Sequence, residues 1–227
     1  MRWLKSGGVA LALLLVVGGC APAEVEGPHG IRGFQDQGYF YVVPVEGGVV
    51  VVDSGGDRDA KLLKEAVGEQ TIKAILLTHG HWDHSAGAGQ FPDVKVLAHR
   101  DEVNLIQGVS RPLGFLPIIF SSTDSPPPAP PLLEGVEDGH VFSVGRDAFT
   151  AIHMPGHTHG ALVWKFRDVL FGGDSVQASG PRLMAGGPLF DDDTPEAQRS
   201  LERLKDVDFN ILLDGHNGRT DDAKSRL

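Results

Sequence analysis

Hydrophobic residues in the first half of the chain are grouped in short β-branched runs separated by turn residues. Two such runs, 39–45 and 49–52, flank a Glu-Gly-Gly turn and predict a β-hairpin. Apolar residues recur at helical spacing over 58–68, and the short apolar run 72–77 predicts another strand. The order strand, helix, strand predicts a βαβ unit early in the fold.

Similar patterns continue along the chain. They predict a strand over 94–98 and a short helix over 100–107, and then further strands over 141–144, 148–153, 161–166, 169–171 and 210–213. Thr194 followed by Pro195 is typical of the N-cap and first turn of a helix, which should run to about Lys205. Two halves that each mix strands and helices predict a layered α/β architecture with its chemistry at strand ends.

Residues 110–135 interrupt this pattern. The apolar patch 115–120 is followed by Pro126-Pro127-Pro128 and Pro130-Pro131, a stretch too irregular for a core and too apolar for a simple linker. Two interpretations remain open for this segment: a lid or wall of a substrate site, or a surface insertion without function.

The N-terminus has the three parts of a secretory signal peptide over residues 1–19. Arg2 and Lys5 precede the apolar run 9–17, which is too short for an ordinary transmembrane helix. The tetrapeptide ending in Cys20, Val-Gly-Gly-Cys, resembles a bacterial lipobox, in which the cysteine carries the lipid. We therefore expect a lipid-anchored protein of the bacterial cell envelope that faces the periplasm or the cell exterior. The alternative is an ordinary cleaved signal with an incidental cysteine.

Composition and charge narrow the class of protein. A chain of 227 residues with 41% apolar residues supports one core, which we expect over 31–227, after a tether over 20–30. The formal net charge of −10 disfavours a nucleic-acid partner, so a small-molecule substrate is expected. Cys20 is the only cysteine, so a metal would have to be bound by histidine and carboxylate. The sequence gives no indication of the oligomeric state.

The candidate chemistry is concentrated in His79-Gly-His-Trp-Asp-His84, directly after the strand predicted over 72–77. In an extended segment His79 and His81 point the same way, whereas Asp83 and His84 enter the next turn and can face a second centre. One short segment can thus supply ligands to two metal ions.

Three further motifs follow, in the order Pro155-Gly-His-Thr158, Gly173-Asp174 and Gly215-His216. Together with the HxHxDH segment they resemble the metallo-β-lactamase superfamily from about residue 31 to residue 216. The resemblance implies a four-layer αββα sandwich with two metal ions, one on three histidines and one on three other ligands, bridged by Asp174. The implied ligands are His79, His81 and His157 for the first ion, and Asp83, His84 and His216 for the second. Zinc is the metal implied, with iron or manganese as alternatives.

The resemblance also implies a metal-dependent hydrolase. In such an enzyme a metal-bound hydroxide attacks a carbonyl, the metals stabilise the oxyanion, and Asp83 orients the nucleophile or passes on its proton. True β-lactamases of the superfamily carry Cys or Ser at the position of Asp174. Glyoxalase II enzymes continue into a helical glutathione-binding region, whereas eleven residues follow His216 here. We therefore expect hydrolysis of an activated acyl bond, with a thioester or lactone favoured.

Three alternatives to this function stay open. They are β-lactam hydrolysis, an oxidoreductase activity as a mononuclear iron persulfide dioxygenase, and a non-catalytic, membrane-tethered metal-binding protein. Among the other candidate residues, Asp53 is expected either to hydrogen-bond a ligand histidine or to stabilise a turn. His153 is expected to be structural, and His159 either contacts substrate or is exposed. His29, His99 and His140 have no motif around them and are also expected to be structural.

Overall fold

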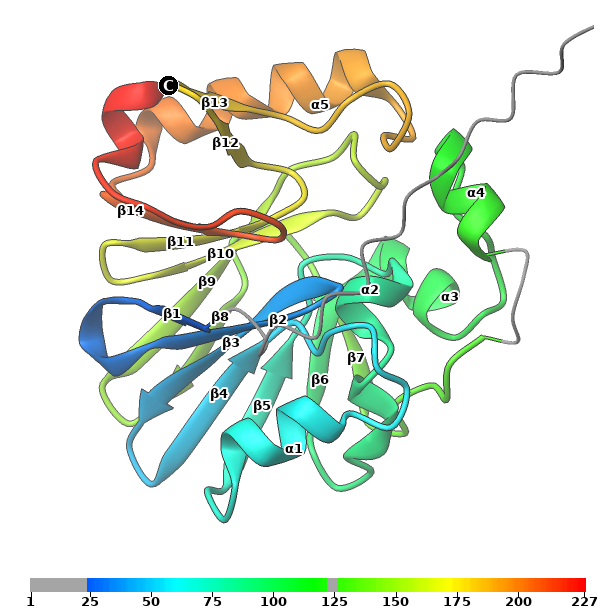
Figure 1. Ribbon diagram of the computed structural model, residues 1–227, viewed down its shortest axis with the longest axis vertical. Helices are drawn as coiled ribbons and strands as arrows, with labels where there is room; N and C mark the ends of the chain where they lie inside the picture. The colour runs from blue at the N-terminus through cyan, green and yellow to red at the C-terminus, as the bar shows by residue number, and fades with distance from the viewer. Residues whose placement is uncertain (1–23, 122–125) are drawn as a thin grey trace, which may run out of the picture.

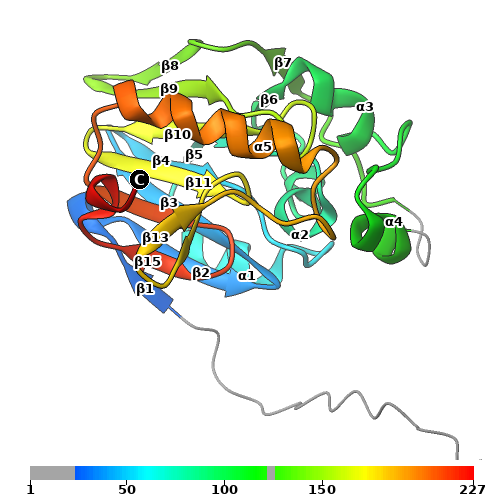
Figure 2. The same cartoon turned by 90° about the horizontal axis from the view of Figure 1, so that it is seen from above.

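Two mixed β-sheets pack face to face, with helices on both outer faces (Figure 1). The computed structural model describes residues 24–121 and 126–227, so the expected signal peptide and Cys20 lie outside the described residues. From one side to the other, the layers are α1, the first sheet, the second sheet and α5, as Figures 1 and 2 show. The predicted αββα sandwich is therefore confirmed.

The first sheet has seven strands in sequence order. They are β1 (Glu24–Glu26), β2 (Arg32–Asp36), β3 (Gly38–Val45), β4 (Gly48–Val52), β5 (Ile72–Leu76), β6 (Val96–His99) and β7 (Leu133–Val136). The pairs from β1 to β4 are antiparallel, and those from β4 to β7 are parallel. Both the predicted hairpin, β3–β4, and the predicted βαβ unit, β4–α1–β5 with α1 at Lys61–Val67, are confirmed.

The second sheet has six strands in the order β15-β14-β11-β10-β9-β8. Their bounds are β8 Val141–Val144, β9 Asp147–His153, β10 Leu162–Phe166, β11 Val169–Gly173, β14 Ile211–Asp214 and β15 Gly218–Thr220. A small separate ribbon pairs β12 (Gln177–Ser179) with β13 (Arg182–Met184). The remaining helices are α2 Trp82–Ser85, α3 Val103–Ile106, α4 Phe115–Ser121 and α5 Thr194–Leu201, with 3₁₀ turns at Pro28–Gly30, Ala88–Gln90, Arg100–Glu102, Glu202–Asp206 and Ala223–Arg226.

The main core lies between the two sheets. Alternate residues of β3 explain why its sequence is almost continuously apolar: Tyr39 and Tyr41 face the second sheet, whereas Phe40 and Val42 pack with α1. Trp164 of β10 is fully buried in the core between the sheets, and its Nε1 donates to the carbonyl of Leu77 at 3.0 Å. The two sheets are therefore joined by packing and by a directed hydrogen bond close to the histidine segment.

The structure differs from the sequence-based expectations at four places. Residues Glu24–Glu26, expected within the tether, form an edge strand paired with β2. The N-cap of α5 is Asp193, whose side chain accepts from the amide of Glu196, and Thr194 is already helical. The strand expected last, β14, is followed by β15. Part of the irregular segment 110–135 forms α4 and β7.

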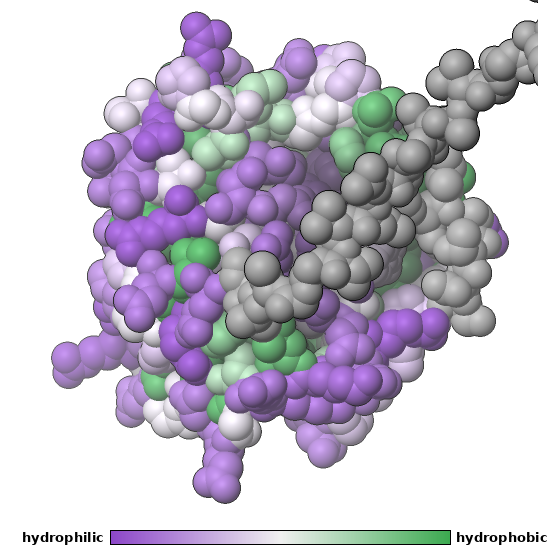
Figure 3. All heavy atoms as spheres, viewed as in Figure 1, coloured by the Kyte–Doolittle hydropathy of each residue, from purple (hydrophilic) through white to green (hydrophobic). Residues whose placement is uncertain are grey.

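The surface fits the acidic, polar composition. The face shown in Figure 3 is mainly hydrophilic, with hydrophobic side chains in separate patches. Within residues 24–121 and 126–227, no helix has the length and apolar character needed to cross a membrane.

Candidate metal centre

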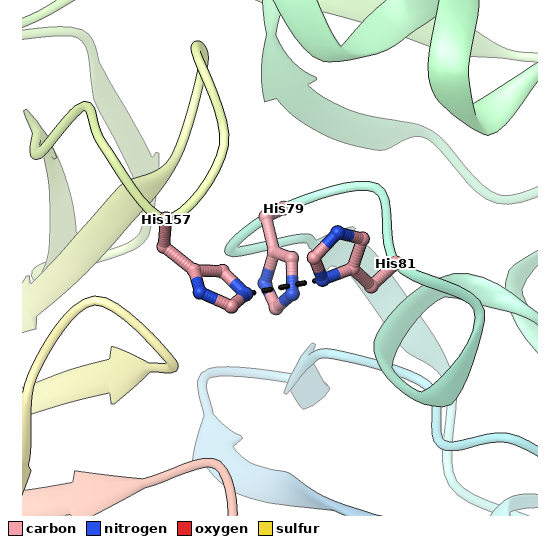
Figure 4. Close-up of side chains that lie close together, drawn as sticks. All are labelled: His79, His81 and His157. Atoms are coloured by element: carbon pink, nitrogen blue, oxygen red, sulfur yellow. Dashed lines mark hydrogen bonds between the residues drawn. The ribbon is translucent and has the colours of Figure 1, made fainter. Parts of the chain in front are cut away.

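Three histidine side chains from two loops point toward one another, as Figure 4 shows. His79 and His81 follow β5, and His157 comes from the turn between β9 and β10. The ring centroid of His157 lies 4.7 Å from that of His79 and 4.8 Å from that of His81. Nε2 of His157 is 3.0 Å from Nδ1 of His81. All three are buried, and we call them the three-histidine group.

A second group adjoins the first. It consists of Asp83 and His84 from α2, Asp174 after β11, and His216 after β14, and we call it the four-residue group. In each group the potential ligand atoms all lie within 4.8 Å of one another. The structure thus brings together all seven residues that the sequence singled out as ligands.

Asp174 lies between the two groups. Its Oδ1 is 3.2 Å from Nε2 of His84, and its Oδ2 is 3.1 Å from Nε2 of His216 and 3.6 Å from Nε2 of His157. One carboxylate therefore faces ligand atoms of both groups, which is the arrangement that a bridging ligand requires.

The donor atoms of the centre fit bound cations. Four buried ligand atoms there have no hydrogen-bond partner within the described residues: Nε2 of His79, His81 and His84, and Oδ1 of Asp174. A buried polar atom without a partner is costly, because it has lost its hydration. Imidazole nitrogen and carboxylate oxygen are the ligands of divalent zinc, iron and manganese, so a cation at each group would satisfy these atoms.

Burial and neighbouring charges shift histidine pKa values in opposite directions in the two groups. Burial, followed by the positive charge that a protonated His84 would carry, holds the pKa of His79 well below its usual value, and burial with His157 does the same to the pKa of His81. These imidazoles are therefore neutral in the folded protein and free to bind a cation.

In the four-residue group the carboxylates dominate. Burial lowers the pKa of His84, but the charges of Asp174 and Asp83 overcome it and raise that pKa well above its usual value. The hydrogen bond that His216 donates to Asp174 raises the pKa of His216 as well. Burial acts to raise the pKa of Asp174, yet His84 and His216 hold it well below its usual range. Without a cation, this group therefore retains protons that a cation would have to displace.

Asp53 orients His84 from behind. It follows β4 in a left-handed conformation (φ 59°) and is buried. Its Oδ2 lies 2.9 Å from Nδ1 of His84, and its Oδ1 accepts the backbone amide of Thr78 at 2.7 Å. Of the two roles expected for Asp53, hydrogen bonding to a candidate ligand is the one that the structure contains.

Sequence reasoning missed three buried carboxylates beside the centre. Asp191 lies 3.1 Å from Nδ1 of His157, and Asp214 accepts the amide of His216 at 3.0 Å. Glu102 accepts amides from both histidine loops. Asp191 stands in the run Asp191–Asp193, which as a sequence signal indicates only a helix start, so no local pattern singled it out.

A cavity of about 1030 Å³ opens onto the centre. Its lining includes His81, Asp83, His157, Asp174 and His216, and also residues of the irregular segment. From that segment come Ser110, Arg111, Pro112, Pro117 and Pro126 to Pro128, and the lining also includes Trp82 and Phe190. Of the two interpretations of segment 110–135, the structure favours the wall of a site.

The remaining histidines lie outside both groups. His99 and His153 stack with ring centroids 4.1 Å apart, and His29 pairs with Asp168 at 2.7 Å. His159 is exposed, and its carbonyl oxygen lies 2.9 Å from Nε2 of His153.

The fold and the site define a class of protein: an αββα sandwich with two adjoining His/Asp groups, each able to hold a metal ion, after its strands. The Metallo-beta-lactamase superfamily model matches residues 33–216, and the chain belongs to this family. The predictions of the superfamily and of a metal-dependent hydrolase are thus confirmed at the level of the family, whose matched relatives are named as hydrolases.

Two curated relatives illustrate the likeness. The hydroxyacylglutathione hydrolase of Aeromonas hydrophila is 28% identical over 185 residues, which cover 81% of this chain and 61% of the relative, so the chain spans about three fifths of that protein. The probable metallo-hydrolase YflN of Bacillus subtilis is 28% identical over 252 residues, which cover 91% of this chain and 89% of the relative.

Solved structures show the same fold. A metallo-beta-lactamase family protein of Thermus thermophilus, TTHA1429, superposes with a TM-score of 0.64 at 22% identity, covering 90% of this chain and 75% of that one. The protein TTHA1623 in a di-iron-bound form superposes with a TM-score of 0.64 at 24% identity, covering 89% and 94%.

Proposed function

We propose that this protein is a dinuclear metal hydrolase of an activated acyl bond, a thioester or a lactone. The observation that carries the proposal is the position of Asp174, whose two oxygens face His84 on one side and His216 and His157 on the other at 3.1 to 3.6 Å. Zinc is the metal proposed, because neutral imidazoles and carboxylates suit it. Iron or manganese is the alternative, and a structural neighbour is named in a di-iron-bound form.

Bound divalent ions would supply Lewis-acid activation of water and stabilisation of an oxyanion. The chain's own residues do the rest. Asp83 has a side chain 20% exposed, with Oδ2 3.6 Å from Nε2 of His216, and so can take a proton from a water at the cavity floor. Asp53 and Asp191 hold His84 and His157 through Nδ1 and thus fix which nitrogen faces the centre.

The acyl class is supported by two observations. One relative is named as a hydrolase of hydroxyacylglutathione. In addition, this chain has a carboxylate, Asp174, at the position where true β-lactamases of the superfamily carry Cys or Ser. A net charge of −10 disfavours polyanionic substrates such as nucleic acids. The cavity wall of segment 110–135 would shape specificity within the class.

The test is a measurement of metal content and of kcat/KM on the zinc-loaded protein with thioester, lactone, β-lactam and phosphodiester substrates. Two ions per chain and the highest kcat/KM on a thioester or lactone are expected. A β-lactam or phosphodiester preferred by tenfold, about 1.4 kcal/mol, would overturn the acyl class. One ion per chain in a folded, metal-replete sample would overturn the dinuclear centre. The variant Asp174→Ala should lose both ions if the carboxylate bridges them.

Attachment to the cell envelope through a lipidated Cys20, after removal of residues 1–19, is part of the same proposal. It is supported by the lipobox-like sequence before Cys20. Several acyl chains hold a protein stably at a membrane, whereas one chain does so only marginally. The variant Cys20→Ser should therefore move the protein from the membrane fraction to the soluble fraction. A cleaved variant that stays with the membrane would contradict the lipid anchor.

A further inference from the structure

Glu102 is a buried carboxylate that contacts both loops of the three-histidine group. It ends the 3₁₀ turn Arg100–Glu102 after β6 and is only 1% exposed. Its Oε2 accepts the amide of Gly80 at 2.7 Å, and its Oε1 accepts the amide of Gly160 at 2.8 Å. Gly80 stands between His79 and His81, and Gly160 is the third residue after His157.

Neither of the two glycine positions has room for a side chain. A Cβ added at Gly80 would lie 2.9 Å from Oε2 of Glu102, and one added at Gly160 would lie 2.9 Å from Cγ and from Oε1 of Glu102. Neither glycine has a positive φ, so backbone conformation does not require glycine at these positions. Close contacts do: besides Glu102, a Cβ would meet Leu105 at Gly80 (3.0 Å) and His99 at Gly160 (2.9 Å). A side chain at either glycine would therefore push its loop away from Glu102.

The connection spans the two halves of the sandwich. Gly80 follows β5 of the first sheet, whereas Gly160 precedes β10 of the second, and Glu102 itself follows β6, the neighbour of β5. A charged acceptor binds an amide more strongly than a neutral one does, and here two amides share one rigid carboxylate. Glu102 is therefore hydrogen-bonded both to the segment that carries His79 and His81 and to the turn that carries His157.

We propose that Glu102 is a positioning residue that fixes the geometry of the three-histidine group by joining its two loops through the amides of Gly80 and Gly160. The proposal rests on the metal centre of the proposed function and requires nothing of its substrate. It predicts that loss of the carboxylate weakens cation binding at the three-histidine group more than at the four-residue group.

Titration of the metal-stripped full chain with Co²⁺ tests this, because cobalt absorption reports ligand geometry. A His157→Ala variant identifies the binding step that belongs to the three-histidine group. Glu102→Gln keeps the size of the side chain but places an amide donor against one of the two backbone donors. We expect it to lower Co²⁺ affinity at that step by tenfold or more and to change the spectrum, while circular dichroism stays as in the wild type.

Two further variants separate position from charge. Asp101→Asn removes the same charge from the adjacent, exposed residue of the same turn, and its Co²⁺ titration should match the wild type. Glu102→Asp keeps the charge but is one methylene too short to reach both amides, so it should retain the defect. It also provides the measurement if Glu102→Gln does not fold.

Wild-type affinity and spectrum in Glu102→Gln would overturn the proposal. Full recovery in Glu102→Asp would also overturn it, because charge alone would then be sufficient. A wild-type chain that binds no Co²⁺ would instead overturn the metal centre of the proposed function, and the role of Glu102 with it.

Discussion

The variant Asp53→Asn tests whether a single hydrogen bond behind His84 controls cation binding. Oδ1 of Asp53 accepts a hydrogen bond from the Thr78 amide at 2.7 Å, and Oδ2 of Asp53 lies 2.9 Å from Nδ1 of His84. A carboxylate can only accept, so Nδ1 carries a proton, and when a cation displaces the second proton of His84, Nε2 is left with its lone pair toward the centre. That nitrogen is 3.2 Å from Asp174.

The substitution reverses this tautomer with little other change. The fixed N–H of Thr78 keeps the amide oxygen of the new side chain on its own side, so the NH₂ group faces Nδ1 of His84 and donates to it. The imidazole then carries its proton on Nε2, where the cation should bind. Asparagine tolerates the left-handed conformation at φ 59°, so the backbone adds no strain.

The expected cost is that of losing the partner behind a metal ligand, about 10- to 100-fold in affinity, or roughly 1.4 to 2.7 kcal/mol. It should fall on the four-residue group, because His84 belongs to that group alone. Zinc competition against a graded series of chelators, with zinc counted per chain, measures it.

The matched control is Asp138→Asn. Asp138 accepts the amide of His153 at 2.7 Å and lies outside both metal groups, so its variant should bind zinc as the wild type does. Unchanged zinc affinity in Asp53→Asn would refute the tautomer argument. So would an equal loss at both groups, because it would indicate a general disturbance of the fold.

Three further predictions follow from the same contacts. Asp191→Ala removes the partner of Nδ1 of His157 and should weaken zinc at the three-histidine group by about tenfold or more, and chelator competition that finds this group intact would count against it. The pKa values of His84 and His216 are raised, while those of His79 and His81 are lowered, so protons compete with zinc more strongly at the four-residue group. As the pH falls, the four-residue group should therefore lose its zinc first, at a higher pH than the three-histidine group. Zinc content per chain along a pH series measures this, and simultaneous loss of both ions would contradict it. Trp164→Ala should lower the free energy of unfolding by about 3–5 kcal/mol in urea denaturation, and a loss below about 1 kcal/mol would show that the core between the sheets collapses to fill the space.

The elements predicted well from the sequence are those whose pattern is local. The hairpin β3–β4 and the strand β5 are largely apolar runs that must be buried, and the runs end at turn residues. The HxHxDH segment is equally local, since all its candidate ligands lie within six residues after one strand. That His157 would meet His79 came from resemblance to a family, because no pattern along the chain sets the register between two sheets.

Elements that depend on tertiary contacts were missed. β1 is only three residues long, with the sequence Glu-Val-Glu, and exists because it pairs with β2. Glu102 lies 22 residues from Gly80 and 58 from Gly160, and Asp191 lies 34 residues from His157. A lone carboxylate in sequence is most often a solvated surface group, so its role becomes visible only when the fold buries it against specific donors.

Segment 110–135 shows why the cavity wall was the hardest part to predict. Its composition indicates neither core nor linker, and its place is set by contacts with a distant loop: Asp192 accepts the amides of Leu113 and Gly114 at 2.9 Å each. The amide of Leu116 in α4 donates to Leu189 of the same loop. The next residue back from Asp192 is Asp191, which holds His157. Two adjacent carboxylates thus fasten the cavity wall and a candidate metal ligand to one short loop, so a change that moves this loop must alter both the shape of the cavity and the geometry of the three-histidine group.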